Sequence, residues 1–394
     1  MGKISLDSTK IEELLTRGVE EIIDRDNLLR RLQSGKPLRI KLGIDPTSPN
    51  LHLGRSIPLL KLRDFQELGH QVVFIIGDFT GLIGDSSDKK SERPMLTEEE
   101  VKENAKTYIQ QAAKLIDIDR AEVYYNSQWL KKLDYLEVNR QADQFSLSEF
   151  IARENIRDRL RLQKRISLRE ILYPLMQGYD SVQVKADVEV GGTDQRFNLL
   201  VGRDMQRFYK QPPQDIITNP LVEGLDGRKM SSSFANSINL LDEPNEMFGR
   251  VMSLNDELII RYFTLLTRVP QSEIDQYQSD LDGGTNPRDI KLKLAEALVE
   301  MYYSDNQAKQ ASDYFLKTFS EKKIPSVRPI FKPNDYNLIS VLVDSGLSAS
   351  RSEARRLIKQ GGLKVNGTAI KDFDYIVSAG AVIQKGKIKF LEIK

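Results

Sequence analysis

Apolar and polar positions follow two alternating patterns along the first part of the chain. Residues 38–44 read as a strand that ends at a proline-rich turn, and helical periodicity then runs from about Gly54 to Leu68. Residues 71–76 are almost continuously apolar, as is typical of a strand buried on both faces of a parallel sheet. We therefore expect a Rossmann-like, doubly wound α/β domain over residues 1–235. Further strands are predicted at 121–125, 184–190 and 215–221.

Helical periodicity dominates two later regions. About residues 98–180 the pattern predicts a helical insertion within the α/β domain, opening with a capping box formed by Thr97 and Glu100. Residues 236–322 are helical again and carry few strand signals. We expect them to form a separate α-helical domain.

A proline-rich stretch marks the clearest boundary. Three prolines within nine residues predict a stiff linker over 323–334, and a small α+β domain is expected over 335–394. In this last domain a capped helix covers about residues 347–359, and Asn366-Gly367 is typical of a tight hairpin. Here ten Lys and Arg stand against six Asp and Glu, a net charge of +4 that leaves −3 on the rest of the chain.

Composition narrows the possible functions. The 58 basic and 57 acidic residues balance to a net charge of +1, so any preference for a polyanion is local to the basic C-terminal domain. No cysteine and only two histidines are present, which argues against a structural metal site and fits a reducing compartment. We expect no secretory signal and no membrane span, and therefore a cytoplasmic protein.

The segment after the first predicted strand carries chemistry suited to a nucleotide. It places Asp45 and Thr47 after the strand, and His52, Gly54 and Arg55 at the start of the following helix. A helix N-terminus at the end of a parallel strand is where α/β sheets bind phosphates. The alternative is that His52 only caps the helix and Arg55 is solvated.

A second charged segment, Lys229 to Ser233 (Lys-Met-Ser-Ser-Ser), follows a glycine-flanked loop. A lysine beside hydroxyl groups can neutralise the charge that develops on a leaving pyrophosphate, and such a loop can close over phosphates. A simple flexible serine loop is the alternative.

Three polar residues, Tyr173, Gln177 and Asp180, share one face of a predicted helix at spacings of four and three. A polar triad among apolar neighbours is suited to a polar ligand, with a buried structural network as the alternative. The glycine-containing stretch from Gly191 to Gln195 reads as a strand-to-helix turn with a capping Asp or Thr.

Taken together, the segments 52–55, 229–233 and 173–180 resemble the class I aminoacyl-tRNA synthetases, and over essentially its full length the chain is similar to bacterial tyrosyl-tRNA synthetases. Its C-terminal domain resembles the S4 RNA-binding module. The resemblance implies a tyrosine–tRNA ligase that uses ATP with Mg²⁺ to form tyrosyl-adenylate and then transfers tyrosine to tRNA(Tyr). It also implies a homodimer.

The resemblance assigns roles to individual residues. The catalytic contacts are His52, Arg55, Lys229, Ser231, Ser232 and Ser233. The ATP-binding residues are Asp45, Thr47, His52, Gly54, Asp194, Lys229, Lys89 and Arg93. The tyrosine-binding residues are Asp85, Tyr173, Gln177, Asp180 and Gln195, with Asp180 accepting the phenol hydroxyl. The RNA-binding residues are Arg351, Arg355, Arg356, Lys359 and Lys364. For Lys89 and Arg93 a solvated loop is the alternative, and for the RNA-binding residues a solvated basic face.

Three positions depart from the family pattern. Arg55 stands where the first signature usually has His, Ser232 where many members have a second Lys, and Lys41 where many have a Tyr that shares the phenol hydroxyl. The second partner of that hydroxyl therefore stays open. Alternatives are a tryptophan-specific relative and an RNA-binding paralogue without activation chemistry, whereas a dehydrogenase is excluded because no G-x-G-x-x-G follows the first strand.

Overall fold

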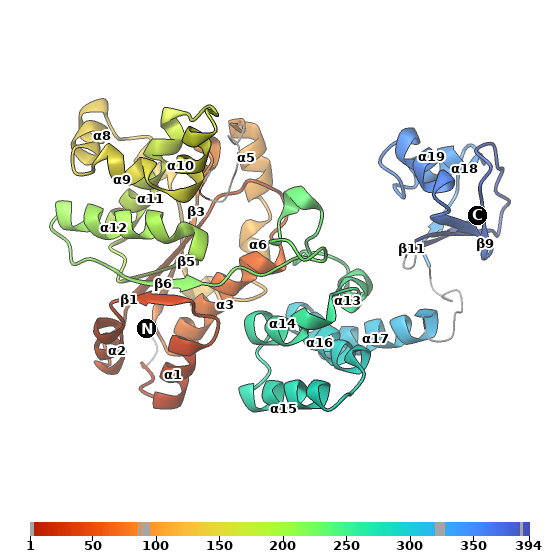
Figure 1. Cartoon of the computed structure of the whole chain (residues 1–394), viewed down its shortest axis with the longest axis horizontal. Helices are drawn as coiled ribbons and strands as arrows, with labels where there is room; N and C mark the ends of the chain where they lie inside the picture. The colour runs from red at the N-terminus through yellow and green to blue at the C-terminus, as the bar shows by residue number, and fades with distance from the viewer. Residues whose placement is uncertain (1–3, 86, 88–94, 320–327, 387–388) are drawn as a thin grey trace.

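The computed structural model describes residues 4–85, 87, 95–319, 328–386 and 389–394. Three parts follow one another along the chain: an α/β part, a group of helices, and a small C-terminal part with its own sheet (Figure 1). No helix within the described stretches is long and apolar enough to cross a membrane.

The α/β part is built on a six-stranded sheet in the order β1-β6-β5-β2-β3-β4. Strand β1 runs antiparallel to β6, and every other neighbouring pair is parallel. The strands are β1 (Glu21–Ile23), β2 (Arg39–Ile44), β3 (Gln71–Ile76), β4 (Glu122–Tyr125), β5 (Val188–Gly192) and β6 (Asp215–Asn219).

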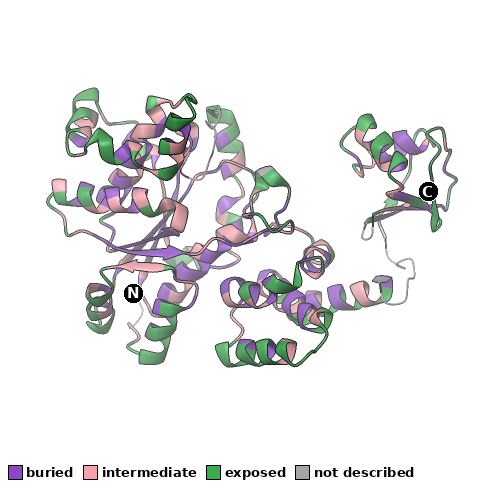
Figure 2. Cartoon of the chain, in the orientation of Figure 1, coloured by how far each residue is buried: buried purple, intermediate pink, exposed green. Residues whose placement is uncertain are grey.

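Helices cover both faces of this sheet, and the strand sequences fit that burial (Figures 1 and 2). Alternate residues of β2, Ile40 and Leu42, join the main core on the side of α3 (Leu53–Glu67). On the opposite face Val73 and Ile75 of β3 pack with the end of α11 (Leu168–Val184). The near-continuous apolar strands are thus buried on both sides, as the pattern predicts.

The remaining helices of the α/β part lie around the sheet. Those outside the region between β4 and β5 are α1 (Ser8–Thr16), α2 (Arg25–Gln33), α4 (Thr80–Ile83), α5 (Glu98–Ala105), α6 (Tyr108–Ala112), α12 (Arg196–Phe208) and the 3-10 turns η1 (Ile118–Arg120), η2 (Thr193–Gln195) and η3 (Ser232–Phe234). Those between β4 and β5 are α7 (Ser127–Leu130), α8 (Tyr135–Ala142), α9 (Leu147–Ile151), α10 (Glu154–Arg161) and α11.

Two details differ from the sequence-based expectation. Strand β1 has no counterpart among the predicted strands, because its three residues are only partly buried and give little apolar signal. Strand β4 confirms the strand predicted at 121–125 and lies within the otherwise mainly helical range 98–180. The strand predicted from Val184 begins only at Val188, because α11 runs to Val184 and Lys185 ends it with a left-handed backbone (φ 49°). The capping box of Thr97 and Glu100 is present as predicted.

The reversal of strand order between the adjacent strands β2 and β5 positions the site. From β2 the chain passes through α3 to β3 on one side, and β5 joins β2 on the other side. The strand order therefore reverses between β2 and β5. In a doubly wound sheet the crevice at the carboxyl ends of such strands is the usual ligand site.

The helical part packs directly on the α/β part. Its helix α14 contacts α3, and one continuous apolar core runs through both parts. Its elements are α13 (Pro244–Met252), η4 (Asp256–Leu258), α14 (Ile259–Leu266), α15 (Gln271–Asp282), α16 (Pro287–Tyr302) and α17 (Asp305–Phe319).

The C-terminal part has a separate apolar core and a sheet in the order β7-β11-β10-β8-β9. The predicted hairpin is confirmed: Asn366 and Gly367 join β8 to β9 with φ of 50° and 83°, the positive values that a two-residue turn requires. Its elements are β7 (Ile330–Phe331), α18 (Leu338–Asp344), α19 (Arg351–Lys359), β8 (Leu363–Val365), β9 (Thr368–Ala369), β10 (Val382–Lys385) and β11 (Lys389–Ile393).

Candidate active site

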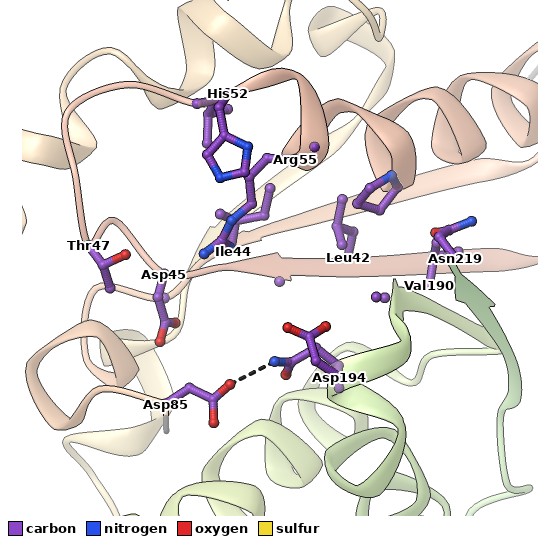
Figure 3. Close-up of a pocket in the computed structure, with 18 of the residues that line it drawn as sticks. Leu42, Ile44, Asp45, Thr47, His52, Arg55, Asp85, Val190, Asp194 and Asn219 are labelled. Carbon is purple, nitrogen blue, oxygen red and sulfur yellow. Dashed lines mark hydrogen bonds between the residues drawn. The ribbon is translucent and has the colours of Figure 1, made fainter. Parts of the chain in front are cut away.

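A cavity of about 320 Å³ opens at the carboxyl ends of β2 and β5, at the reversal of strand order. Figure 3 shows its residues converging from several segments, with His52 and Arg55 on the side of α3 and Asp194 on the side of the turn after β5. The residues assigned from the sequence that line it are Asp45, Thr47, His52, Gly54, Arg55, Asp85, Tyr173, Gln177, Asp180, Asp194, Gln195, Lys229, Ser231 and Ser232.

The first signature lies at the N-terminus of α3. His52 is the N-cap residue by position, but its side chain makes no capping hydrogen bond, so capping does not explain its type. Burial, followed by the positive charges of Arg55 and Lys229, lowers the pKa of His52 to about 3. The imidazole is therefore neutral at physiological pH. A Cβ on Gly54 would lie 3.1 Å from this ring, so any larger residue there would press on the imidazole.

Asp45 follows β2 and lines the cavity near Thr47 (Figure 3). Its carboxylate accepts hydrogen bonds from Thr80 Oγ1 at 2.6 Å and from the Tyr173 hydroxyl at 2.8 Å. Burial raises its pKa to about 6 although both hydrogen bonds favour the charged form. Tyr173 is thus anchored to Asp45.

Asp180 lies on α11 as a buried acceptor, only 3% exposed. Its two oxygens accept from Trp129 Nε1 at 2.7 Å and from Asn126 Nδ2 at 3.1 Å. Burial raises the pKa of Asp180 to about 7, although the charge of Lys41 and the two donors act in the opposite direction. This carboxylate is positioned to accept a further hydrogen bond from a ligand hydroxyl.

A chain of side-chain amides links α11 to the turn after β5. Gln195 donates to Asp85 at 2.7 Å, which is the dashed contact in Figure 3. Asn198 donates to the side-chain oxygens of both Gln177 (3.1 Å) and Gln195 (3.0 Å). Oxygen acceptors from three segments therefore surround one end of the cavity, as a ligand ammonium group requires.

The second signature lies in the loop between β6 and α13, and it contacts the first. Met230 is buried, and its sulfur accepts a hydrogen bond from the Gly54 backbone N–H at 3.2 Å. Lys229 Nζ forms an ion pair with Asp194 at 2.9 Å. Asn236 ties the loop together through Ser231 and Asp226. Both signatures and the turn after β5 therefore meet over the cavity.

Some assigned residues are not part of this cluster. Lys89, Arg93 and the side chain of Ser233 lie outside the part of the chain that the structure describes. The assigned RNA-binding residues belong to the C-terminal part: on α19 or just beyond it, all are exposed and none lines the cavity, namely Arg351, Arg355, Arg356, Lys359 and Lys364.

Sequence reasoning missed four residues that build the site: Thr80, Asn126, Trp129 and Glu189. Asn126 follows β4 at the carboxyl edge of the sheet, a position that could have indicated it. Glu189 is a charged residue between two valines of a buried strand, and Trp129 is the single tryptophan of the chain. Thr80 carried no signal beyond its place in a glycine-containing loop.

Lys41 does not take the place of the family's tyrosine in the cavity. Its side chain is fully buried, and its ammonium group donates to Gln177 O at 2.9 Å and Ser181 Oγ at 2.7 Å and pairs with Glu189 at 2.8 Å. All three donors of the ammonium group are used, so Lys41 has none left for a ligand hydroxyl.

Comparison with known proteins agrees with this geometry. Residues 33–320 match the family model "tRNA synthetases class I (W and Y)", and residues 338–383 match the S4 domain. The chain is 44% identical over 386 residues to the tyrosine–tRNA ligase of Thermotoga maritima, covering 97% of this chain and 96% of that protein. It is 45% identical over 382 residues to the ligase of Haemophilus ducreyi, with 96% of each chain covered.

Solved structures share the fold. A C-terminally truncated mitochondrial tyrosyl-tRNA synthetase of Aspergillus nidulans aligns with a TM-score of 0.67 at 23% identity, covering 79% of this chain and 94% of that one. The synthetase of Archaeoglobus fulgidus, solved with L-tyrosine, aligns with a TM-score of 0.63 at 23% identity over 78% of this chain and 100% of that one. By its sequence relatives and family models, the chain belongs to the class I tRNA synthetases, among the bacterial tyrosyl-tRNA synthetases with a C-terminal S4 domain.

Proposed function

We propose that this cavity activates L-tyrosine with ATP and then passes the tyrosyl group to the 3′ end of tRNA(Tyr). The observation that carries the substrate assignment is Asp180, a buried carboxylate held by Asn126 and Trp129 and open to the cavity. A buried acceptor suits a phenol hydroxyl, and a substrate without that hydroxyl would leave the acceptor unpaired.

In the first step the tyrosine carboxylate attacks the α-phosphorus of ATP, and the bond to pyrophosphate breaks. Tyr173, Gln177 and Asp85 hold the substrate ammonium group, with Gln195 beside the tyrosyl group. His52, Gly54 and Arg55, together with Asp45 and Thr47, face the nucleotide from the start of α3 and the preceding turn. Positioning and charge stabilisation are sufficient for this chemistry, so no covalent enzyme intermediate is required.

ATP binding would separate the pair of Lys229 and Asp194. Asp194 would turn to the ribose hydroxyls, and Lys229 would meet the charge that develops on pyrophosphate, with Ser231, Ser232 and Ser233 supporting the loop. Mg²⁺ would enter with ATP as part of the substrate, because phosphate oxygens are its preferred ligands. Lys89 and Arg93 would reach the same phosphates.

The test of this function is ATP/pyrophosphate exchange measured with each of the twenty amino acids in turn. We expect exchange with tyrosine and very little with phenylalanine. Exchange with tryptophan would favour the tryptophan-specific alternative, and no exchange with any amino acid would favour an RNA-binding protein without activation chemistry.

The pKa of Asp180 predicts a pH dependence. Because burial raises this pKa to about 7, the carboxyl is protonated in slightly acidic solution and ionised above that pH. Only the ionised form offers acceptors to Asn126, Trp129 and the substrate hydroxyl together. We expect kcat/KM for tyrosine in the exchange reaction to rise with pH through about 7. A flat profile across that range would contradict this assignment.

We also propose a division of labour among the parts of the chain. Residues 1–235 would carry activation, residues 236–322 would form an anticodon-binding type of domain, and 335–394 would bind RNA after the 323–334 linker. The support for the last assignment is α19, whose basic residues are exposed. Basic side chains on one face of a helix contact phosphates with salt-dependent affinity.

The RNA-binding proposal predicts the effect of reversing two charges on α19. In the double variant Arg355→Glu with Arg356→Glu, tRNA affinity should fall and its salt dependence should weaken by about two units of slope, as expected for two lost phosphate contacts. ATP/pyrophosphate exchange should not change. The matched control reverses two exposed lysines far from α19, Lys10→Glu with Lys36→Glu. Equal losses in the two variants would argue against a specific role of α19.

We propose that the protein acts as a homodimer through the helices between β4 and β5. Half of the large apolar side chains exposed on the described residues lie there, which is typical of a surface covered by a partner. They are Tyr135, Leu136, Leu147, Leu160, Leu162 and Leu168.

We further propose that the protein works in the cytoplasm. The proposed substrates ATP and tRNA, and a chain without cysteine, favour that location.

The dimer proposal predicts that charges introduced into the proposed interface separate the two subunits. We expect the double variant Leu162→Glu with Leu168→Glu to sediment as a monomer, because two charges in an apolar interface lose their hydration. The control places the same charges on exposed apolar residues outside the insertion, Leu6→Glu with Ile330→Glu, and should keep the wild-type state. A wild-type protein that sediments as a monomer would refute the proposal.

A further inference from the structure

Lys41 and Glu189 are a pair of charges in the middle of an apolar sheet. They are register partners on the adjacent strands β2 and β5, and both side chains point to the face covered by α11. Their side chains are 0% and 1% exposed, and Nζ lies 2.8 Å from Oε1. Such a buried ion pair stabilises the fold less than apolar packing does, so stability alone does not explain why these two residues are present.

The ammonium group of Lys41 fixes one turn of α11. Besides Glu189, it donates to the Gln177 carbonyl and the Ser181 hydroxyl, which are one helical turn apart. Asp180 lies within that same turn. The three bonds therefore set where this turn sits relative to β2, and with it the position of Asp180 at the cavity wall.

Glu189 sets the orientation of the Gln177 side chain. A carboxylate only accepts hydrogen bonds, so the contact of 3.3 Å between Gln177 Nε2 and Glu189 Oε1 points the amide nitrogen toward the sheet. The amide oxygen then faces the opposite way, where Asn198 donates to it. A substrate ammonium group needs that oxygen and would be repelled by the nitrogen.

The same pair acts on Asp180 through charge. The groups that face Asp180 come from β2, β5, the segment after β4 and its own helix. They are Lys41, Glu189, Asn126, Trp129 and Tyr173. The nearby ammonium charge lowers the pKa of Asp180, and the carboxylate of Glu189 raises it. The two charges therefore push the ionisation of Asp180 in opposite directions.

We propose that Lys41 and Glu189 are positioning residues for the tyrosine site: they present the Gln177 amide oxygen to the substrate ammonium group and hold Asp180 as an acceptor for the phenol hydroxyl. This proposal rests on the function proposed above. Neither residue needs to contact the reacting atoms. In this chain the pair would hold Asp180 in place as the acceptor of the phenol hydroxyl. Lys41 itself donates no hydrogen bond into the cavity.

Two single variants test the proposal because they should shift one pH profile in opposite directions. In Lys41→Met the rise of kcat/KM for tyrosine should move to higher pH by about one unit, which is about a tenfold loss on the acidic side. In Glu189→Gln the rise should move to lower pH, and KM for tyrosine should increase because the Gln177 amide is no longer oriented. KM for ATP should change little in both variants.

The double variant Lys41→Met with Glu189→Gln removes both charges and provides the test if a single variant does not fold. Its kcat/KM for tyrosine should rise at nearly the same pH as in the wild type, but its KM for tyrosine should still be increased. The matched control is Lys61→Met, which removes another buried ammonium group, bonded to the carbonyls of Leu14 and Arg17. That control should leave the profile unchanged.

The outcomes are separable. Folded single variants with an unshifted profile and an unchanged KM for tyrosine would overturn the positioning role, as would a double variant with an unchanged KM. Failure of the proposed function would be different, because the wild-type protein itself would then show no tyrosine-dependent exchange.

Discussion

Replacing Asp180 by alanine is expected to abolish most of the preference for tyrosine over phenylalanine. The substitution removes the acceptor that we propose for the phenol hydroxyl and leaves the donors of Trp129 and Asn126 unpaired in a buried wall. A hydrogen bond to a charged group contributes about 1.5–3 kcal/mol, so kcat/KM for tyrosine should fall by roughly 10- to 100-fold. Phenylalanine has no hydroxyl to lose, and its kcat/KM should change little.

The measurement is ATP/pyrophosphate exchange with each amino acid at pH values above the titration of Asp180. A matched control is Asp215→Ala, which removes another buried carboxylate that pairs with Arg31 outside the cavity. The control should lose stability and keep the ratio of tyrosine to phenylalanine. If Asp180→Ala also kept that ratio, Asp180 would not be the hydroxyl acceptor.

The second large effect is expected from Lys229→Ala. In the free protein the ammonium group pairs with Asp194. In the proposed function it would neutralise the leaving pyrophosphate once ATP binds. Removing one preorganised group of this kind typically costs about 10²- to 10³-fold in rate. We therefore expect the rate of adenylate formation to fall by that factor, with an unchanged KM for tyrosine, because the proposed function places Lys229 at the nucleotide and not at tyrosine.

Single-turnover formation of tyrosyl-adenylate gives this rate without interference from tRNA. The neighbouring Arg228 offers a control in the same loop: it pairs with Asp226, stacks over Phe234 at 4.4 Å and does not line the cavity. Arg228→Ala should be close to wild type. A Lys229→Ala variant with a normal rate but a raised KM for ATP would limit Lys229 to ground-state binding.

The parts of the fold that were predictable are those specified by local sequence. The apolar run 71–76 is buried on both faces in β3. Thr97 and Glu100 form the predicted capping box at the start of α5. Asn366 and Gly367 make the predicted turn because few other residues accept positive φ. The edge strand β1 was not predicted, because a strand of three partly buried residues carries little periodicity.

The residues of the candidate site also fall into two groups, those recognisable from local sequence and those brought in only by tertiary packing. Signature residues such as His52 and Lys229 stand out from the sequence, since their residue types and spacings are local. The partners of Asp180 do not: Asn126 and Trp129 lie more than fifty positions earlier in the chain and reach it only through packing of α7 and the end of β4 against α11. No spacing rule connects residues so far apart.

The sequence by itself determined the parallel strands of the α/β domain, the two signatures and the basic C-terminal domain, because each depends on neighbouring residues. Only the tertiary structure decided which polar groups meet and how they ionise. The register of β2 with β5 pairs Lys41 with Glu189, and burial raises the pKa of Asp180 to about 7. Register and burial depend on long-range packing, and desolvation acts only once the chain has folded around a charge.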